Sequence, residues 1–230
     1  MNRDGTIRRA VRNWSVVALV GLSAGCHASR DGSKSTAPLP SSAAAQPPEV
    51  RADAAEATGP QLRAELLVMR DKDQELRAQV VSGENRLTAA YRLNQLDAAH
   101  TTRMREIVDE YGWPTQTMVG KDGAGAAWLL IQHADGAIDF QRRCLDLMQP
   151  LVERGDVSAV QVAYLTDRVR VHEGRPQLYG TQFRLVGDEW EPFPIEDPGQ
   201  VDQRRADAGL EPLAEYRAQI QRSYGKAGGE

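Results

Sequence analysis

The chain has 230 residues, with 28 lysines and arginines against 32 aspartates and glutamates, so its formal net charge is −4. General nucleic-acid binding depends on clustered positive charge, so we expect no nucleic-acid partner for this acidic chain. Its two cysteines are too few for a disulfide scaffold or for a four-thiolate zinc site.

The N-terminus has the features of a secretory signal. Four arginines within residues 1–12 precede a largely apolar run over residues 13–25, which is shorter than the roughly 20 residues that span a bilayer. Leu22-Ser23-Ala24-Gly25-Cys26 resembles a bacterial lipobox. The resemblance implies cleavage before Cys26 and lipidation of its sulfur, with palmitate among the acyl chains. An ordinary signal peptide followed by a chance cysteine is the alternative.

The segment after Cys26 is expected to be a tether. Residues 26–60 are rich in proline, alanine and serine and contain no aromatic residue, which predicts a disordered, lipid-anchored linker. The expected partner is therefore a membrane of the bacterial envelope. His27 stands where an aspartate would favour the inner membrane, so the periplasmic face of the outer membrane is slightly favoured. Residues 226–230 are expected to be a disordered tail.

Residues 61–225 are expected to form one mainly helical domain. Apolar side chains recur at helical spacing in six segments, and a seventh helix is expected from Asp197-Pro198 to Gly209. The six segments are 62–80, 87–111, 124–134, 140–151, 160–171 and 213–224. Residues 112–125 are expected to be a loop, in which the glycines serve turns or approach a ligand closely.

One region has the alternating pattern of a β-strand instead of helical spacing. Residues 177–186 place apolar and polar side chains in turn, Gly187-Asp188 can reverse the chain, and residues 189–195 return. The predicted fold class is a multi-helix, bundle-like domain with one small antiparallel β-hairpin near residues 177–195.

Polar side chains interrupt the apolar stripes and supply the candidate site. Asp73 fills a position on the first stripe, where it is either a rim residue or a buried group with a partner. The catalytic candidates are His133, Asp167 and Arg168. The ligand-binding candidates are Asp73, Gln74, Arg103, Gln132, Asp135, Gln141, Gln177, Tyr179 and Gln182. Cys144 lies on an apolar stripe, which favours a packed thiol over a nucleophile.

Many of these residues fall within five short motifs. The motifs are Gly112-Trp113-Pro114, Gln132-His133-Ala134-Asp135, Phe140-Gln141, Tyr164-Leu165-Thr166-Asp167-Arg168 and Tyr179-Gly180-Thr181-Gln182. In this combination, and with Asp73-Gln74 in the first helix, the sequence resembles a bacterial domain-of-unknown-function family over about residues 66–220. The resemblance supports the domain boundaries and selects the same polar residues. It implies no activity, because the family has none established.

The candidate residues are compatible with several roles. A histidine with a carboxylate partner acts as a general acid or base near neutral pH, and His133 with Asp135 or Asp167 is the expected pair. Arg103 and Arg168 are candidates to hold a carboxylate or a phosphate. The same residue types also form satisfied structural networks.

Two hypotheses therefore stay open. The first is an envelope module that binds an unidentified small molecule or protein, or that is structural. The alternative is a metal-independent hydrolase or transferase with His133 as general acid and base. No cofactor and no metal are expected, because the histidines at 100, 133 and 172 lack a short ligand spacing.

Overall fold

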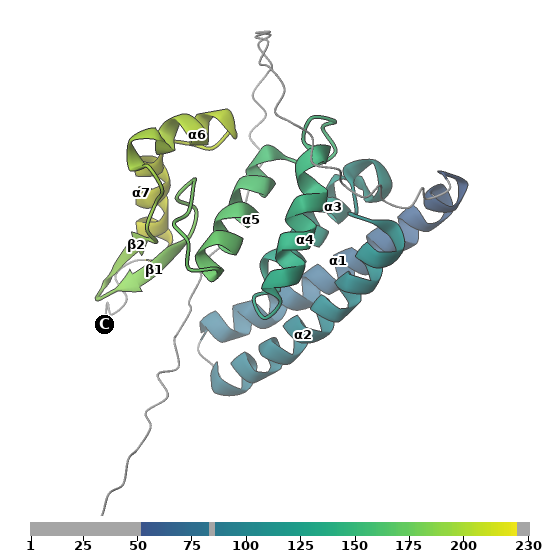
Figure 1. Ribbon diagram of the computed structural model, residues 1–230. Helices are drawn as coiled ribbons and strands as arrows, with labels where there is room; N and C mark the ends of the chain where they lie inside the picture. The colour runs from purple at the N-terminus through teal and green to yellow at the C-terminus, as the bar shows by residue number, and fades with distance from the viewer. Residues whose placement is uncertain (1–51, 83–85, 225–230) are drawn as a thin grey trace, which may run out of the picture. The chain divides into compact units, whose positions relative to one another are not determined.

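The computed structural model describes residues 52–82 and 86–224, which divide into two compact units (Figure 1). One unit contains the described residues up to Val162 and the other those from Ala163 onward. The predicted signal peptide, Cys26, the linker up to residue 51 and the tail from residue 226 lie outside the described residues. No helix in residues 52–82 or 86–224 combines the length and the apolar character needed to cross a bilayer.

The N-terminal unit consists of helices. These are α1 (Ala52–Ser82), α2 (Arg86–Tyr111), α3 (Gln116–Gln132) and α4 (Ile138–Met148), with one 3₁₀ turn, η1 (Gln149–Leu151). Helix α1 packs against both α2 and α3. It begins at Ala52, before residue 62, where the sequence predicts the first helical segment to start, and its first residues are alanine-rich, which favours helix.

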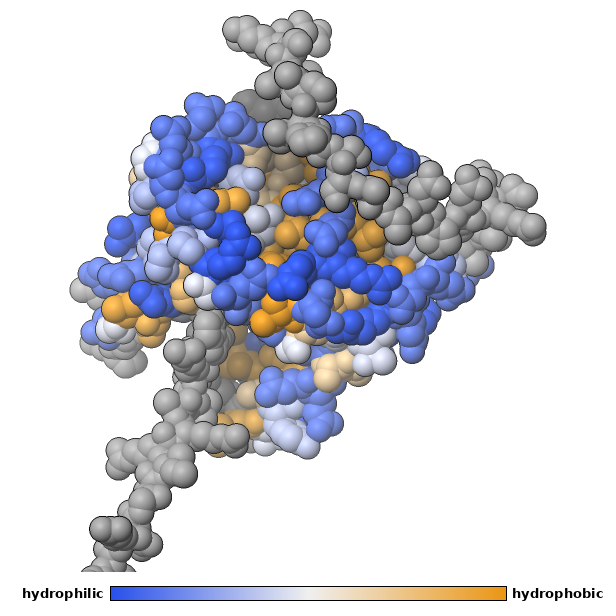
Figure 2. Space-filling model, in the orientation of Figure 1, coloured by the Kyte–Doolittle hydropathy of each residue, from blue (hydrophilic) through white to orange (hydrophobic). Residues whose placement is uncertain are grey.

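The predicted apolar stripes form the core of this unit. Leu62, Leu66 and Met69 of α1 are buried, and Met104 and Ile107 of α2 are buried with them. Each set follows the spacing of three or four residues that places side chains on one helical face. Hydrophilic side chains cover much of the opposite surface of α1 and α2 in the view of Figure 2. Asp73 continues the buried stripe of α1 and is fully buried.

The loop expected over residues 112–125 is wrong in part. Helix α3 already begins at Gln116, because the Thr115 hydroxyl caps it by accepting a hydrogen bond from the Met118 N–H at 3.2 Å. The helix is interrupted at Gly120, whose φ of 71° lies in the region that favours glycine. Since α3 ends at Gln132, His133 becomes its C-terminal capping residue.

The C-terminal unit begins within α5 (Ala159–His172). It continues through β1 (Phe183–Val186), β2 (Glu189–Pro192), the 3₁₀ turn η2 (Pro198–Gln200), α6 (Val201–Asp207) and α7 (Leu213–Tyr224). Strands β1 and β2 pair antiparallel, with Val186 opposite Glu189 across the predicted Gly187-Asp188 turn. The predicted fold class is confirmed for the described residues, which form seven α-helices and one small two-stranded sheet.

One predicted helix start differs. A helix was expected from Asp197-Pro198, but Asp197 has a φ of 45° and its side chain makes no capping hydrogen bond. A 3₁₀ turn follows, and α6 begins only at Val201. At the start of α5, the Gln161 Oε1 atom accepts a hydrogen bond from the Ser158 N–H at 3.4 Å, which is one half of a capping box.

Candidate functional site

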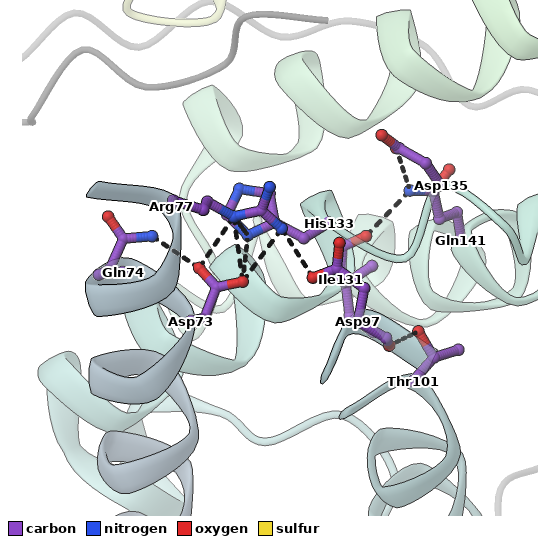
Figure 3. Close-up of polar contacts among 9 residues, drawn as sticks. All are labelled: Asp73, Gln74, Arg77, Asp97, Thr101, Ile131, His133, Asp135 and Gln141. Atoms are coloured by element: carbon purple, nitrogen blue, oxygen red, sulfur yellow. Dashed lines mark hydrogen bonds and ion pairs between the residues drawn. The ribbon is translucent and has the colours of Figure 1, made fainter. Parts of the chain in front are cut away.

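Four side chains of the N-terminal unit meet in a polar group that we call the Asp73 cluster: Asp73 and Arg77 of α1, Asp97 of α2 and His133 at the end of α3 (Figure 3). Asp73 Oδ1 lies 3.0 Å from His133 Nδ1. The Arg77 Nε atom lies 3.1 and 3.2 Å from the two Asp73 oxygens, and its Nη2 lies 2.7 Å from Asp97 Oδ1. Three helices therefore contribute to one set of polar contacts.

The geometry selects a tautomer for His133. Its Nδ1 lies 3.0 Å from both Asp73 Oδ1 and Arg77 Nε, but a single nitrogen cannot both donate to the carboxylate and accept from the guanidinium. If Nδ1 were unprotonated, its lone pair would face the ionised carboxylate and be repelled by it. We therefore assign the proton to Nδ1, which donates to Asp73. Arg77 then donates to Asp73, and Nε2 is the imidazole nitrogen that gains and loses the second proton.

The two carboxylates of the cluster differ in acidity. Burial by itself would raise the pKa of Asp73, but hydrogen bonds and charge from His133 and Arg77 hold that pKa well below its usual range. Burial raises the pKa of Asp97 to about 6, and Arg77 only partly opposes the rise. The negative charges of Asp73 and Asp135 add to it. Asp73 is therefore ionised at neutral pH, whereas Asp97 titrates close to it.

The cluster is mostly buried but reaches the surface on one side. The Asp73 side chain is 0% exposed and that of His133 is 8% exposed. The Arg77 and Asp97 side chains are 25% and 23% exposed. The Arg77 and Asp97 side chains are therefore the part of the cluster that solvent reaches most, whereas the Asp73 side chain is shielded from it.

Other predicted site residues lie around this cluster. The Gln74 side-chain amide donates to Asp73 Oδ2 at 2.7 Å. Gln141 of α4 donates to the Ile131 carbonyl at 3.0 Å and lies 3.4 Å from Asp135 Oδ1, so it satisfies the last turn of α3 (Figure 3). Gln132 is fully buried. The sequence predicted Asp135 or Asp167 as the partner of His133, but the carboxylate on its Nδ1 is that of Asp73.

Arg103 does not join the cluster. Its guanidinium pairs with Glu65 at 2.6 Å and with Glu106 at 2.7 Å, and all three side chains are more than a third exposed. The positive charge predicted to hold an anionic ligand is therefore balanced by two carboxylates at the surface. Surface pairs of this kind contribute about 1 kcal/mol or less to stability.

In the C-terminal unit, Asp167 organises the chain between α5 and β1. Its fully buried carboxylate accepts hydrogen bonds from the N–H groups of Leu178, Tyr179 and Thr181 at 2.6, 3.0 and 2.9 Å, and from the Thr181 hydroxyl at 3.0 Å. Burial raises the pKa of Asp167, and these donors act in the opposite direction. We call residues 177–182 the Asp167 loop.

Side chains of the Asp167 loop also bind backbone. The Gln177 amide donates to the carbonyls of Gln182 and Phe193 at 3.0 and 2.9 Å, and its oxygen accepts from the Gln182 N–H at 2.8 Å. The Tyr179 carbonyl accepts from Arg205 Nη1 at 2.6 Å. The predicted ligand-binding residues Gln177, Tyr179 and Gln182 therefore come together, in contacts that define the loop. Arg168, also in this unit, is buried.

Neither a metal site nor a reactive thiol stands out in the described chain. No three His, Cys, Asp or Glu side chains within residues 52–82 and 86–224 are arranged to hold a metal ion. Cys144 of α4 is fully buried, and burial raises the pKa of its thiol to about 12. A thiol with that pKa is not a nucleophile at neutral pH, which favours the packed role.

The sequence analysis missed two members of the Asp73 cluster. Arg77 follows Asp73 by four residues on α1, a spacing that places both on one face and that could have identified it. Asp97 gives no comparable signal, because its proximity to Asp73 arises only when α2 packs beside α1. Arg205, a fully buried arginine of α6, was missed as well, since its partners are backbone carbonyls.

Comparison with known proteins identifies a family. Residues 60–227 match the model of a family of unknown function (DUF6624), which covers nearly all of the described chain. No curated protein and no protein of solved structure shows significant similarity to the chain.

Proposed function

The chain belongs to the DUF6624 family, to which no function is assigned, and we propose that it is an enzyme of the hydrolase or transferase type with His133 as general acid and base. One observation carries the proposal: the 3.0 Å contact between His133 Nδ1 and the fully buried carboxylate of Asp73. A buried aspartate on Nδ1 fixes the tautomer and orientation of the ring, and it stabilises the imidazolium that forms when Nε2 takes a proton.

The surroundings support this role. Hydrogen bonds and charge from His133, together with those from Arg77, hold the pKa of Asp73 well below its usual range, so the carboxylate does not compete with the imidazole for the proton. His133 also caps the C-terminus of α3, where the helix dipole favours a protonated imidazole. In such a site Nε2 accepts the proton of an attacking hydroxyl or water and then returns it to the leaving group.

A binding or structural module is the second candidate, and a specific contact favours it. Arg77 pairs with Asp73 within α1 and with Asp97 of α2, so the same network that orients His133 also joins two helices. If this were the whole role of the cluster, substitution of His133 would lower stability and affect no reaction.

The test is the His133→Gln variant of the full chain on a panel of p-nitrophenyl esters, phosphates and glycosides. We expect kcat/KM on the substrate that the wild-type chain hydrolyses to fall by about 100-fold or more, because the proton transfer is lost. Circular dichroism checks that the variant is folded. Turnover that persists in His133→Gln contradicts the proposal. A wild-type chain with no turnover and a variant that unfolds more easily support the binding or structural module.

Arg103→Gln is the matched control. It removes the arginine that the sequence suggested as an anion holder but that pairs with Glu65 and Glu106 at the surface. We expect its kcat/KM to equal that of the wild-type chain, since the guanidinium of Arg103 pairs with Glu65 and Glu106 and not with a member of the Asp73 cluster.

We also propose that the enzyme is lipid-anchored in the bacterial envelope, at the periplasmic face of the outer membrane. The lipobox-like segment that ends at Cys26 supports this, as does the proline-rich stretch that follows it. The acidic composition supports a non-nucleic-acid substrate. One thioether-linked diacylglycerol with an added acyl chain supplies the two lipid signals that stable anchoring needs.

Replacing Cys26 tests the anchor, and the second cysteine provides the control. In a Gram-negative host, we expect Cys26→Ser to abolish labelling by radioactive palmitate and to move the chain from the membrane pellet to the soluble fraction. Cys144→Ser removes a buried thiol from α4 and is expected to keep both the label and the membrane association. A Cys26→Ser chain that is still labelled and still sediments with membranes would show that the anchor lies elsewhere.

A further inference from the structure

We infer that Asp97 is a positioning residue for His133, acting through the guanidinium of Arg77. Its catalytic consequence rests on the proposed function, but the coupling itself does not. The geometry behind it is a guanidinium shared by two carboxylates: Arg77 Nη2 lies 2.7 Å from Asp97 Oδ1, and Arg77 Nε lies 3.1 Å from Asp73 Oδ1. Because the guanidinium is rigid, its placement against one carboxylate fixes its placement against the other.

The two protonation states of Asp97 then give His133 different surroundings. When Asp97 is ionised, it balances the charge of Arg77, and the Asp73 carboxylate is left to stabilise the imidazolium. When Asp97 is protonated, the whole charge of Arg77 acts on Asp73 and on the imidazole 3.0 Å away. The imidazolium is then less stable, so His133 holds its second proton less tightly.

The charged groups around Asp97 favour a switch near neutral pH. Asp73 and Arg77 face it from α1, and His133 and Asp135 lie at and just beyond the end of α3 (Figure 3). His100 lies one turn along α2, where burial lowers its pKa and its Nδ1 has no hydrogen-bond partner among the described residues. The raised pKa of Asp97, about 6, falls where an imidazole also titrates.

The experiment measures the pKa of His133 directly. The chain has four histidines, so ¹³C labelling of histidine resolves each ring by NMR, and the His133→Gln variant assigns its signal. In Asp97→Asn we expect the pKa of His133 to fall by about 0.5 or more, because a negative charge is removed and Arg77 acts on Asp73 alone. An unchanged or higher pKa overturns the inference.

Two further variants test whether Asp97 acts on His133 through Arg77. In an Arg77→Gln background, we expect Asp97→Asn to change the His133 pKa by less than half as much as it does in the wild-type chain. An equal change in both backgrounds would mean that Asp97 acts directly through space, which also overturns the inference. Asp109→Asn is the matched control, since Asp109 lies on the same helix and pairs with Arg143 of α4. It should leave the His133 pKa unaltered.

The readout needs no substrate, so its failure differs from failure of the proposed function. A chain without turnover that shows the coupled change in the His133 pKa refutes the enzyme and retains the positioning role. A chain with His133-dependent turnover and no coupling retains the enzyme and refutes the role of Asp97.

Discussion

Replacing Asp167 by alanine is expected to lower the free energy of unfolding by about 4 kcal/mol, the cost of leaving buried donors without their charged acceptor. The carboxylate is fully buried and accepts from three backbone N–H groups of the Asp167 loop and from the Thr181 hydroxyl. Alanine removes both oxygens, and the loop has no second set of acceptors for these donors. Urea denaturation of the full chain, followed by far-UV circular dichroism, measures the change.

Asp207→Ala is the control for this experiment. Asp207 is an exposed residue of α6 that accepts one hydrogen bond, from the Gln203 side chain at 2.9 Å. Its replacement should change the unfolding free energy by about 0.5 kcal/mol or less, as for most surface positions. If Asp167→Ala cost no more than Asp207→Ala, the carboxylate would not be what holds residues 177–182 in place.

The Asp167 loop also shows where sequence patterns stop being informative. The sequence marked the polar residues at 167, 177, 179 and 182 as site candidates, and in the structure these four residues lie together. The prediction concerned side chains that face a ligand, whereas most of the contacts are between a side chain and backbone N–H or carbonyl groups. A backbone group is present at every residue, so no pattern of residue types indicates which of them a buried carboxylate will bind.

The fold could be predicted from the sequence more fully than the site, for a physical reason. Helix positions follow from the spacing of apolar residues along one segment, as with Leu62, Leu66 and Met69. The same stripe singled out Asp73 as either a rim residue or a buried group with a partner. The partners Asp97 and His133 come from other helices, and their distance from Asp73 depends on how α2 and α3 pack against α1, which periodicity does not specify.

The prediction of a loop over residues 112–125 was wrong in part because glycine is common both in turns and at tightly packed positions within helices. Gly120, Gly123 and Gly125 suggested turns, yet only Gly120 among them has a positive φ. Gly123 lies inside helical backbone, where an added Cβ would meet the Val119 side chain at 3.0 Å. Glycine at that position therefore serves close packing within a helix, a role that the sequence does not distinguish from a turn.

Replacing Asp73 by asparagine is expected to lower the unfolding free energy at pH 7 by about 3 kcal/mol, because one partner of a buried ionic network is removed. Asparagine has the shape of aspartate, but its amide donates where Arg77 and His133 also donate. The guanidinium and the imidazole N–H then compete for a single neutral oxygen. Asp71→Asn, two residues away on α1 and exposed, should stay within about 0.5 kcal/mol of the wild-type chain.

The dependence of this loss on pH is the more specific result. The pKa of Asp73 is held below its value in the unfolded chain, about 3.9. The stabilisation is therefore fully present above about pH 4 and is lost as the pH falls further, since the unfolded chain binds the proton first. Urea denaturation between pH 7 and pH 2.5 should show the wild-type and Asp73→Asn free energies converging below about pH 4. A difference that stays constant over that range would mean that Asp73 is not held ionised by Arg77 and His133. The role proposed for Asp73, orienting His133 and stabilising its imidazolium, would then be contradicted.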